Sequence, residues 1–176
     1  ARECDVELGR LFMQITEYQH PVAESYAVIH VSTGQEAKNY AEYQKVVNRI
    51  DIPVVQVGGP QDPLLQNVTD LRGKKIQETA GIIRKAKVFI GGDSICAHIA
   101  GYTETPSVLL YGSTFPKLTA PISSVTTSII EPSNRFGCER PCHLAKCNRS
   151  PNGCINNILP DYVVDVISKI GIPTKA

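Results

Sequence analysis

The 176-residue sequence contains no tryptophan, a single methionine and no apolar run that approaches the roughly 18 residues of a membrane-spanning helix. It also has no excess of charge of either sign, because 18 Lys and Arg residues stand against 17 Asp and Glu for a net charge of +1. A balanced charge gives no electrostatic basis for binding nucleic acid or an anionic membrane. We therefore expect no nucleic-acid partner and no membrane span.

Two features of the first residues are missing as well. The opening Ala-Arg-Glu-Cys-Asp is not a secretory signal, and the chain does not begin with methionine. The first absence favours a cytoplasmic location, and the second favours a processed or excised piece. The length suits one domain over residues 1–176, and no internal repeat or low-complexity linker divides it.

Strand and helix patterns alternate along the chain. Apolar, β-branched runs bounded by Gly or Pro predict buried strands, and apolar residues at helical spacing predict amphipathic helices. The expected strands are residues 26–31, 53–57, 88–90, 108–111 and 125–130, and the expected helices are 5–18, 38–49, 63–68, 76–85, one that starts near Ser94, and a closing helix at 160–170. This alternation predicts an α/β fold with a doubly wound, parallel, Rossmann-like sheet.

The stretch Lys87 to Gly112 is the candidate site around which the rest is organised. It predicts two buried strands joined by a helix, with Gly91-Gly92-Asp93-Ser94 after the first strand and residues 112–114 after the second. Ligands of open parallel sheets bind beyond the carboxyl ends of the strands, so we expect both loops to face one crevice. The helix that starts near Ser94 offers unpaired N–H groups and a favourable dipole to a phosphate.

Three side chains of this helix start are candidates for binding. The Ser94 hydroxyl is a further donor, and His98 lies one turn later on the same helix face. Asp93 is either a helix cap or an acid that faces the ligand. His98 is either a ligand-binding group or an ordinary core histidine.

The loops after the first two strands supply a second set. Ser32 and Thr33 follow the first strand, and Lys38 stands at the start of the next helix, where its ammonium could neutralise a leaving diphosphate; the alternative is a solvated surface lysine. Ribose hydroxyls need an acceptor after the second strand, and Gln61 or Asp62 is best placed there.

Four of the six cysteines, Cys138, Cys142, Cys147 and Cys154, fall in one short segment with the spacing C-x3-C-x4-C-x6-C. Four thiolates can close a tetrahedral shell around zinc or iron, which is the arrangement of structural metal sites. His143 is a nearby spare ligand. Two local disulfides are the alternative.

Taken together, the motifs over roughly residues 26–167 resemble the carboxyl-terminal, donor-binding half of the ADP-heptose heptosyltransferases, which act on lipopolysaccharide core or on proteins. The order and spacing of the motifs are what is similar. They are Gly58-Gly59-Pro60, Leu71-Arg72-Gly73-Lys74, Gly92-Asp93-Ser94 with His98, Pro106 leading to Leu110-Tyr111-Gly112-Ser113-Thr114, and the four clustered cysteines.

The resemblance implies a GT-B glycosyltransferase of two Rossmann-like domains, of which this chain is one half. It implies ADP-heptose or a similar nucleotide sugar as donor, a phosphate contact from the lysine of Lys38-Asn39-Tyr40, and a metal in the cysteine cluster of protein-directed members. It also implies that the acceptor site and the general base come from a missing domain or partner chain, and that no catalytic divalent ion is needed. Ile95 departs from the family, which usually has glycine there, so the donor pocket is expected to differ in shape.

The sequence thus predicts the donor domain of an inverting heptosyltransferase-like enzyme, inactive as this chain alone, in which Lys38, Ser94 and the helix start stabilise charge on the leaving group. The alternative is a stand-alone nucleotide or nucleotide-sugar binding module without transfer activity. An NAD-type dehydrogenase is disfavoured because no G-x-G-x-x-G follows the first strand.

Overall fold

The computed structural model describes residues 15, 25–133, 137–138, 141–142, 144–149 and 153–175, and the structural statements below concern these residues. The helix expected at residues 5–18 lies outside them apart from residue 15. None of the helices in the described ranges is long and apolar enough to cross a membrane.

The core of the chain is a six-stranded sheet in the order β3-β2-β1-β4-β5-β6, in which every pairing is parallel. The strands are β1 (Ala27–His30), β2 (Val54–Val57), β3 (Thr69–Asp70), β4 (Val88–Gly92), β5 (Ser107–Leu110) and β6 (Thr127–Ile130). The chain starts at the centre, moves outward to β3, and then returns across β1 to add β4, β5 and β6 on the other side. This confirms the doubly wound, Rossmann-like sheet and places its switch point between β1 and β4.

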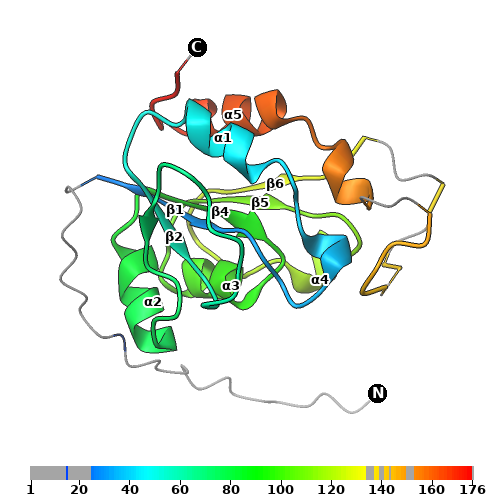
Figure 1. The fold of residues 1–176 in the computed structure, drawn as a ribbon, viewed down its shortest axis with the longest axis horizontal. Coiled ribbons are helices and arrows are strands. Elements are labelled where there is room, and N and C mark those ends of the chain that lie inside the picture. Colours follow the sequence, from blue (N-terminus) through cyan, green and yellow to red (C-terminus); the bar gives the residue numbers. More distant parts are fainter. Residues whose placement is uncertain are drawn as a thin grey trace.

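Helices cover both faces of the sheet (Figure 1). The helices α1 (Tyr43–Arg49) and α5 (Pro160–Lys169) lie together on one face, and α2 (Ile76–Arg84) and α3 (Ile95–Tyr102) lie together on the other. A short helix α4 (Pro116–Thr119) follows β5, and two 3-10 turns, η1 (Glu36–Lys38) and η2 (Cys154–Asn157), complete the described elements.

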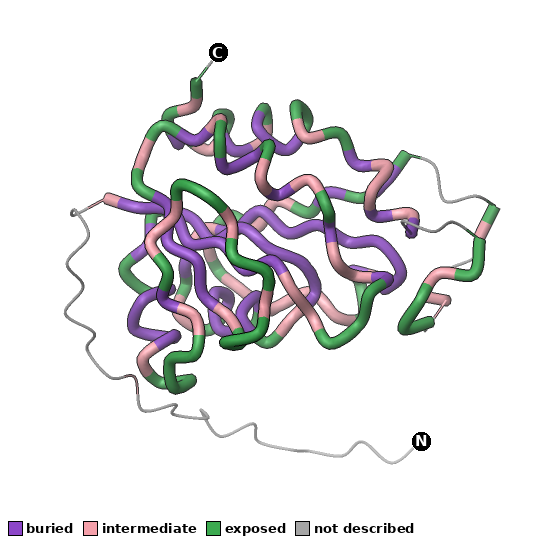
Figure 2. The backbone as a smooth tube through the Cα atoms, in the orientation of Figure 1, coloured by how far each residue is buried: buried purple, intermediate pink, exposed green. Residues whose placement is uncertain are grey.

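The central strands are buried on both sides, as the purple tube in Figure 2 shows. Alternate side chains enter two separate cores: Ile29 and Ile90 pack under α1 and α5, whereas Val28 and Phe89 pack under α2 and α3. Because side chains alternate along a strand, His30 shares the face of Val28 and points toward α3. The buried side chain of His30 therefore lies at the end of β1 on the α3 side of the sheet.

Two expectations for the helices were wrong. No helix forms at 63–68, because the buried Gln56 side chain donates to the Pro63 carbonyl at 2.6 Å and accepts from the Leu65 amide at 2.9 Å. These bonds hold an irregular connection that leads into the short strand β3. The helix expected at 38–49 is split into η1 and α1, since the Ala41 amide donates to the side chain of Asn156 instead of to a helical carbonyl.

Candidate functional site

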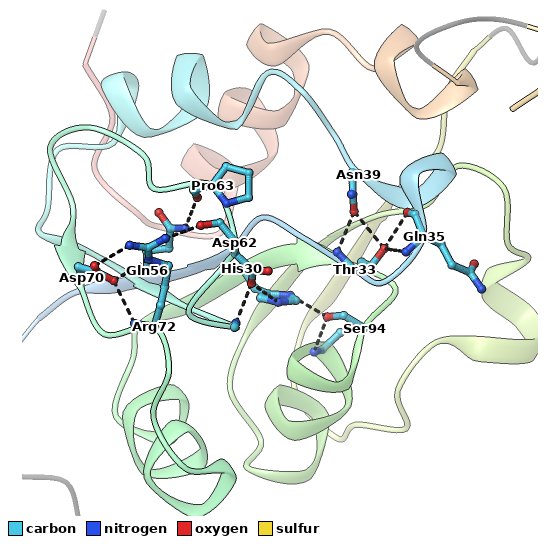
Figure 3. Close-up of polar contacts among 12 residues, drawn as sticks. His30, Thr33, Gln35, Asn39, Gln56, Asp62, Pro63, Asp70, Arg72 and Ser94 are labelled. Carbon is cyan, nitrogen blue, oxygen red and sulfur yellow. Dashed lines mark hydrogen bonds and ion pairs between the residues drawn. The ribbon is translucent and has the colours of Figure 1, made fainter. Parts of the chain in front are cut away.

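A cavity of about 530 Å³ opens at the carboxyl ends of β1, β2 and β4, which is the switch point of the sheet. We call it the strand-end pocket. It is lined by His30, Ser32, Thr33, Gly34, Gln35, Lys38, Gly59, Asp62, Asp93, Ser94 and Ile95. We call the loops that follow β1 and β2 the β1 loop and the β2 loop. Figure 3 shows polar contacts within each of these loops and the contacts of His30, at the end of β1, with Asp62 and with Ser94 at the start of α3.

Two glycines at the end of β4 let the neighbouring backbone approach this pocket. A Cβ atom on Gly91 would lie 3.2 Å from the His30 carbonyl oxygen, and one on Gly92 would lie 3.2 Å from that of Lys38. Larger residues would push the β1 loop away from the sheet edge. The glycine pair therefore sets how closely η1 and Lys38 lie over the end of β4.

Lys38 and Asp93 form an ion pair across the pocket. The Lys38 Nζ atom donates to Asp93 Oδ2 at 2.8 Å, and the Asp93 side chain is only 8% exposed. An ammonium has three N–H donors, so one bond to Asp93 leaves two for a ligand. The lysine is thus held at the end of β4 beside the start of α3, and it is not a freely solvated surface residue.

Ser94 is the residue that caps α3. Its backbone is extended, and its Oγ atom accepts from the Ala97 amide at 3.4 Å. The reading of Asp93 as the helix cap is therefore wrong, because the cap stands one residue later and Asp93 pairs with Lys38 instead. The first N–H groups of a helix have no intrahelical partner, so this end of α3 can accept an anion.

His30 connects the start of α3 to the β2 loop. Its Nδ1 atom lies 3.1 Å from Ser94 Oγ, and its Nε2 atom lies 3.7 Å from Asp62 Oδ2, so the ring stands between the two (Figure 3). Burial lowers the pKa of His30, and the nearby Asp62 carboxylate acts in the opposite direction. The imidazole is consequently neutral at neutral pH in this state.

Two further contacts hold Asp62 in place in the β2 loop. Asp62 Oδ2 accepts from the Gly59 amide at 2.8 Å, and the Asp62 carbonyl accepts from the Arg72 guanidinium. Arg72 also binds both oxygens of Asp70, and these bonds lower the pKa of Asp70 to about 2. The Asp62 carboxylate is therefore positioned at the pocket, where it can accept a hydroxyl group.

The structure brings together most of the residues that the sequence singled out. Ser32, Thr33, Lys38, Asp62, Asp93 and Ser94 all line the strand-end pocket. Thr33 is already bonded, since its amide and its hydroxyl both donate to the Asn39 side chain. Gln61 and His98 are exposed and are absent from the lining, so neither is gathered with the others. Ile95 is 61% exposed and stands at the pocket's rim.

Residues 112–114, expected to face the same crevice, lie instead against the cysteine segment, which we define as residues 137–154. The Cys142 amide donates to the Ser113 carbonyl at 3.2 Å, and a Cβ atom on Gly112 would lie 2.7 Å from the side chain of Ile155, which directly follows the segment in η2. On the other side, the Ala37 amide donates to the Ala145 carbonyl at 2.9 Å. The described part of the segment therefore contacts both η1, through Ala145, and the loop after β5, through Cys142.

The four cysteines of this segment are partly buried thiols, and none of the described cysteines forms a disulfide. As a set of donors, four thiols suit zinc or iron. Within the described ranges, however, no three His, Cys, Asp or Glu side chains are gathered closely enough to hold a metal ion. His143 lies outside those ranges. The donor chemistry fits a metal, whereas the arrangement of these residues shows no assembled shell.

Sequence reasoning missed His30 as a site residue and treated it only as part of a strand. The signal that could have found it is its position: an imidazole stands at the end of a fully apolar strand, directly before the Val-Ser-Thr loop. It also missed the Asp70–Arg72 contact that fixes the β2 loop. The contacts of His30 depend on which strands become neighbours, whereas Asp70 and Arg72 are only two positions apart and their pairing depends on the conformation of the loop after β3.

The fold and the pocket define a Rossmann-like domain with an anion-accepting helix start at the switch point of its sheet. The sequence profile of glycosyltransferase family 9 (heptosyltransferase) matches residues 3–147, and this chain belongs to that family. A search of curated proteins finds no match.

Solved structures of the family have the same fold. A family 9 glycosyltransferase from Veillonella parvula is similar with a TM-score of 0.67 at 15% identity, over 84% of this chain and 46% of that one. E. coli heptosyltransferase WaaC with ADP gives a TM-score of 0.65 at 15% identity, over 86% and 46%. The iron-containing dodecameric glycosyltransferase TibC from enterotoxigenic E. coli gives 0.63 at 22% identity, over 86% and 47%. The chain thus spans less than half the length of these GT-B proteins.

Proposed function

We propose that the chain is the nucleotide-sugar-binding domain of an inverting heptosyltransferase, with ADP-heptose or a closely similar donor. The observation that carries this is the placement of Lys38 and Ser94 at the start of α3, in a chain that belongs to glycosyltransferase family 9. WaaC has been solved with ADP, and TibC in complex with ADP-D-beta-D-heptose, which supports the same class of donor here.

In this mechanism an acceptor hydroxyl attacks the anomeric carbon from the face opposite the nucleotide. The C–O bond to the diphosphate breaks, the new C–O bond forms with inversion, and the electron pair leaves with the nucleoside diphosphate. The two spare N–H groups of Lys38, the Ser94 hydroxyl and the start of α3 stabilise the charge that develops on the leaving oxygen. Asp62 is the proposed acceptor for a ribose hydroxyl.

The remaining parts of the reaction are assigned to a domain that faces this one. Transfer needs a positioned acceptor and a general base within hydrogen-bonding reach of its hydroxyl. The chain spans 46% of the length of WaaC, which is consistent with one domain of a two-domain enzyme. We assign the acceptor, a lipopolysaccharide or a protein, to that missing domain or partner chain, and the cytoplasmic location stays a prediction from the sequence.

We also propose that Cys138, Cys142, Cys147 and Cys154 hold one structural zinc or iron ion. Four reduced thiols in one segment, and the iron-containing TibC among the similar structures, support this. Such an ion would order the segment and takes no part in the transfer step. Elemental analysis of the purified chain should find about one zinc or iron per chain, and a metal-free chain with these cysteines oxidised would refute the proposal.

Titration calorimetry tests the main proposal. The 176-residue chain should bind ADP and ADP-heptose, and it should transfer no heptose to lipopolysaccharide or protein acceptors unless the missing half is supplied. Failure to bind any adenine nucleotide would overturn the assignment of the donor site. Turnover by this chain alone would instead overturn the assignment of the acceptor site and general base to another domain, and would show that this domain forms a complete active site by itself.

A further inference from the structure

The charges around the strand-end pocket do not suit a diphosphate as they stand. Among its lining residues Lys38 is cationic and Asp62 and Asp93 are anionic, which leaves one negative charge in excess while His30 is neutral. The two phosphates of a nucleotide sugar would add two more. Additional positive charge would favour binding there, and His30 is the lining residue that can gain it near neutral pH.

Protonation of His30 would reverse the direction of its hydrogen bond with Ser94. In the neutral tautomer that carries its proton on Nε2, the N–H points toward Asp62, and Nδ1 accepts the Ser94 hydroxyl proton. The other neutral tautomer sets the lone pair of Nε2 against the Asp62 carboxylate. The cation donates from both nitrogens, so Ser94 Oγ accepts from His30 and its own proton becomes available to a ligand.

We propose that His30 is a positioning residue of the donor site, which takes up a proton when the nucleotide diphosphate binds and thereby turns the Ser94 hydroxyl from the imidazole toward a phosphate. This rests on the proposed function, since it takes a nucleoside diphosphate as the ligand of the strand-end pocket. His30 acts through Ser94 and supplies charge beside the phosphates.

The other titratable and charged groups around His30 either favour its protonation or keep the same charge when a ligand binds. From the β2 loop, Asp62 raises the pKa of His30 against the effect of burial, and its carbonyl is held by Arg72. From α3, Cys96 is neutral because burial raises its pKa to about 12. The Lys38–Asp93 pair has no net charge. A bound diphosphate therefore adds the charge that shifts the balance.

Proton uptake is measured directly by titration calorimetry in buffers of different ionisation enthalpy at pH 7.5. The probe is ADP-ribose, because each of its phosphates carries one ester and one anhydride bond and so has no ionisation near neutral pH. The wild-type chain should take up a sizeable fraction of one proton per ADP-ribose, and its affinity should fall with rising pH by up to about tenfold per pH unit. His30→Gln should bind more weakly, without uptake and without this pH dependence.

Two further variants make the result specific. Asp62→Asn removes the carboxylate that stabilises the cation, so the uptake per bound ligand should fall even where affinity also falls. His98→Gln changes the exposed histidine of α3 and should leave the uptake as in the wild type. If His30→Gln does not fold, unchanged uptake in Asp62→Asn overturns the inference, and reduced uptake supports it.

The outcomes separate this inference from the proposed function. Binding of ADP-ribose by the wild-type chain without proton uptake overturns the role of His30 and leaves the donor site standing. Uptake that persists in His30→Gln, or that disappears in His98→Gln, does the same. Absence of binding by both ADP and ADP-ribose overturns the proposed function, and the inference with it.

Discussion

The strand-end pocket and the described part of the cysteine segment both border η1, and different forces hold them. In the pocket, side-chain hydrogen bonds position the proposed ligand-binding groups: Lys38 is bonded to Asp93, and Ser94 to His30. In the cysteine segment, the described residues from 137 to 153 form no helix or strand. Backbone bonds such as Ala37 to Ala145 attach that segment to its neighbours.

The difference shows where each region obtains its order. Strand ends are positioned by the sheet, so polar groups that follow β1, β2 and β4 converge without any ligand. A segment without regular structure buries few backbone bonds, and thiols contribute order only once something crosslinks them. Since Ala37 and Lys38 are neighbours in η1, loosening of the cysteine segment is expected to reach as far as that turn and to leave the strands that form the pocket in place.

Removing the proposed zinc or iron ion should have the largest effect and should separate the two regions. Chelation should speed amide exchange throughout the cysteine segment and at Ala37, whose amide is bound to Ala145, while the β1 and β4 amides stay protected. Hydrogen exchange followed by mass spectrometry measures this. Uniform loosening of sheet and segment together would show that the two regions are not independent.

Lys38→Met should have the next largest effect, because it leaves Asp93 buried without its partner. We expect a loss of about 3 kcal/mol in the free energy of unfolding, at the lower end for a buried pair because Lys38 is partly exposed. ADP binding should weaken about ten- to a hundredfold.

Lys169→Met is the matched control for that variant. It removes a Lys–Asp pair of similar length, 2.6 Å to Asp165, on the exposed surface of α5. Its cost should stay below about 1 kcal/mol, and ADP affinity should not change. Urea unfolding and calorimetry on both variants make the comparison, and equal losses would mean that the Lys38–Asp93 pair is no better shielded than a surface pair.

The fold could be predicted from the sequence because its strands are nearly continuous apolar runs. Residues 88–90 and 108–111 read as buried strands with no other information, and the parallel, doubly wound sheet followed from their alternation with helices. The connection at 63–68 could not be read, since it depends on Gln56, a single buried polar residue in β2 that bonds to backbone seven to nine positions away.

The candidate site was predictable in its loops and not in its pairings. Lys38, Asp93 and Ser94 could be named because they follow strands and precede helices, which topology alone brings together. That Lys38 binds Asp93, that Ser94 is the cap, and that His98 faces outward depend on side-chain rotamers and on the exact start of α3. His30 was missed because a strand pattern records burial but not which loop the buried group touches.

Gly58→Ala tests how tightly the pocket side is interlocked. Gly58 has a φ of +139°, and a Cβ atom there would overlap the Asp62 carboxylate and lie 3.0 Å from the His30 ring. We expect the free energy of unfolding to fall by about 2–3 kcal/mol and ADP binding to weaken. Gly171→Ala is the control, because Gly171 also has a positive φ, +87°, but has open space around its Cβ position. The free energy of unfolding of Gly171→Ala should fall by about 1 kcal/mol, and its ADP binding should be unchanged.

The smallest expected effect is a pH dependence of stability that only the pocket side should show. Burial lowers the pKa of His30 below its ordinary value of 6.5, so at lower pH the unfolded chain binds more protons at this residue than the folded chain does. The contribution of His30 to the free energy of unfolding is then fully present above about pH 6.5. It falls as the pH drops toward the folded-state pKa, by at most about 1.4 kcal/mol per pH unit.

Asp70 does not interfere, because its pKa of about 2 and its ordinary value of 3.8 both lie below this window. Urea unfolding of the metal-free chain at pH 7.5 and pH 5.5 should therefore show a smaller pH-dependent loss in His30→Gln than in the wild type. Equal losses in the two proteins would mean that the imidazole is as easily protonated in the folded chain as in the unfolded one, and that the pocket does not hold it neutral.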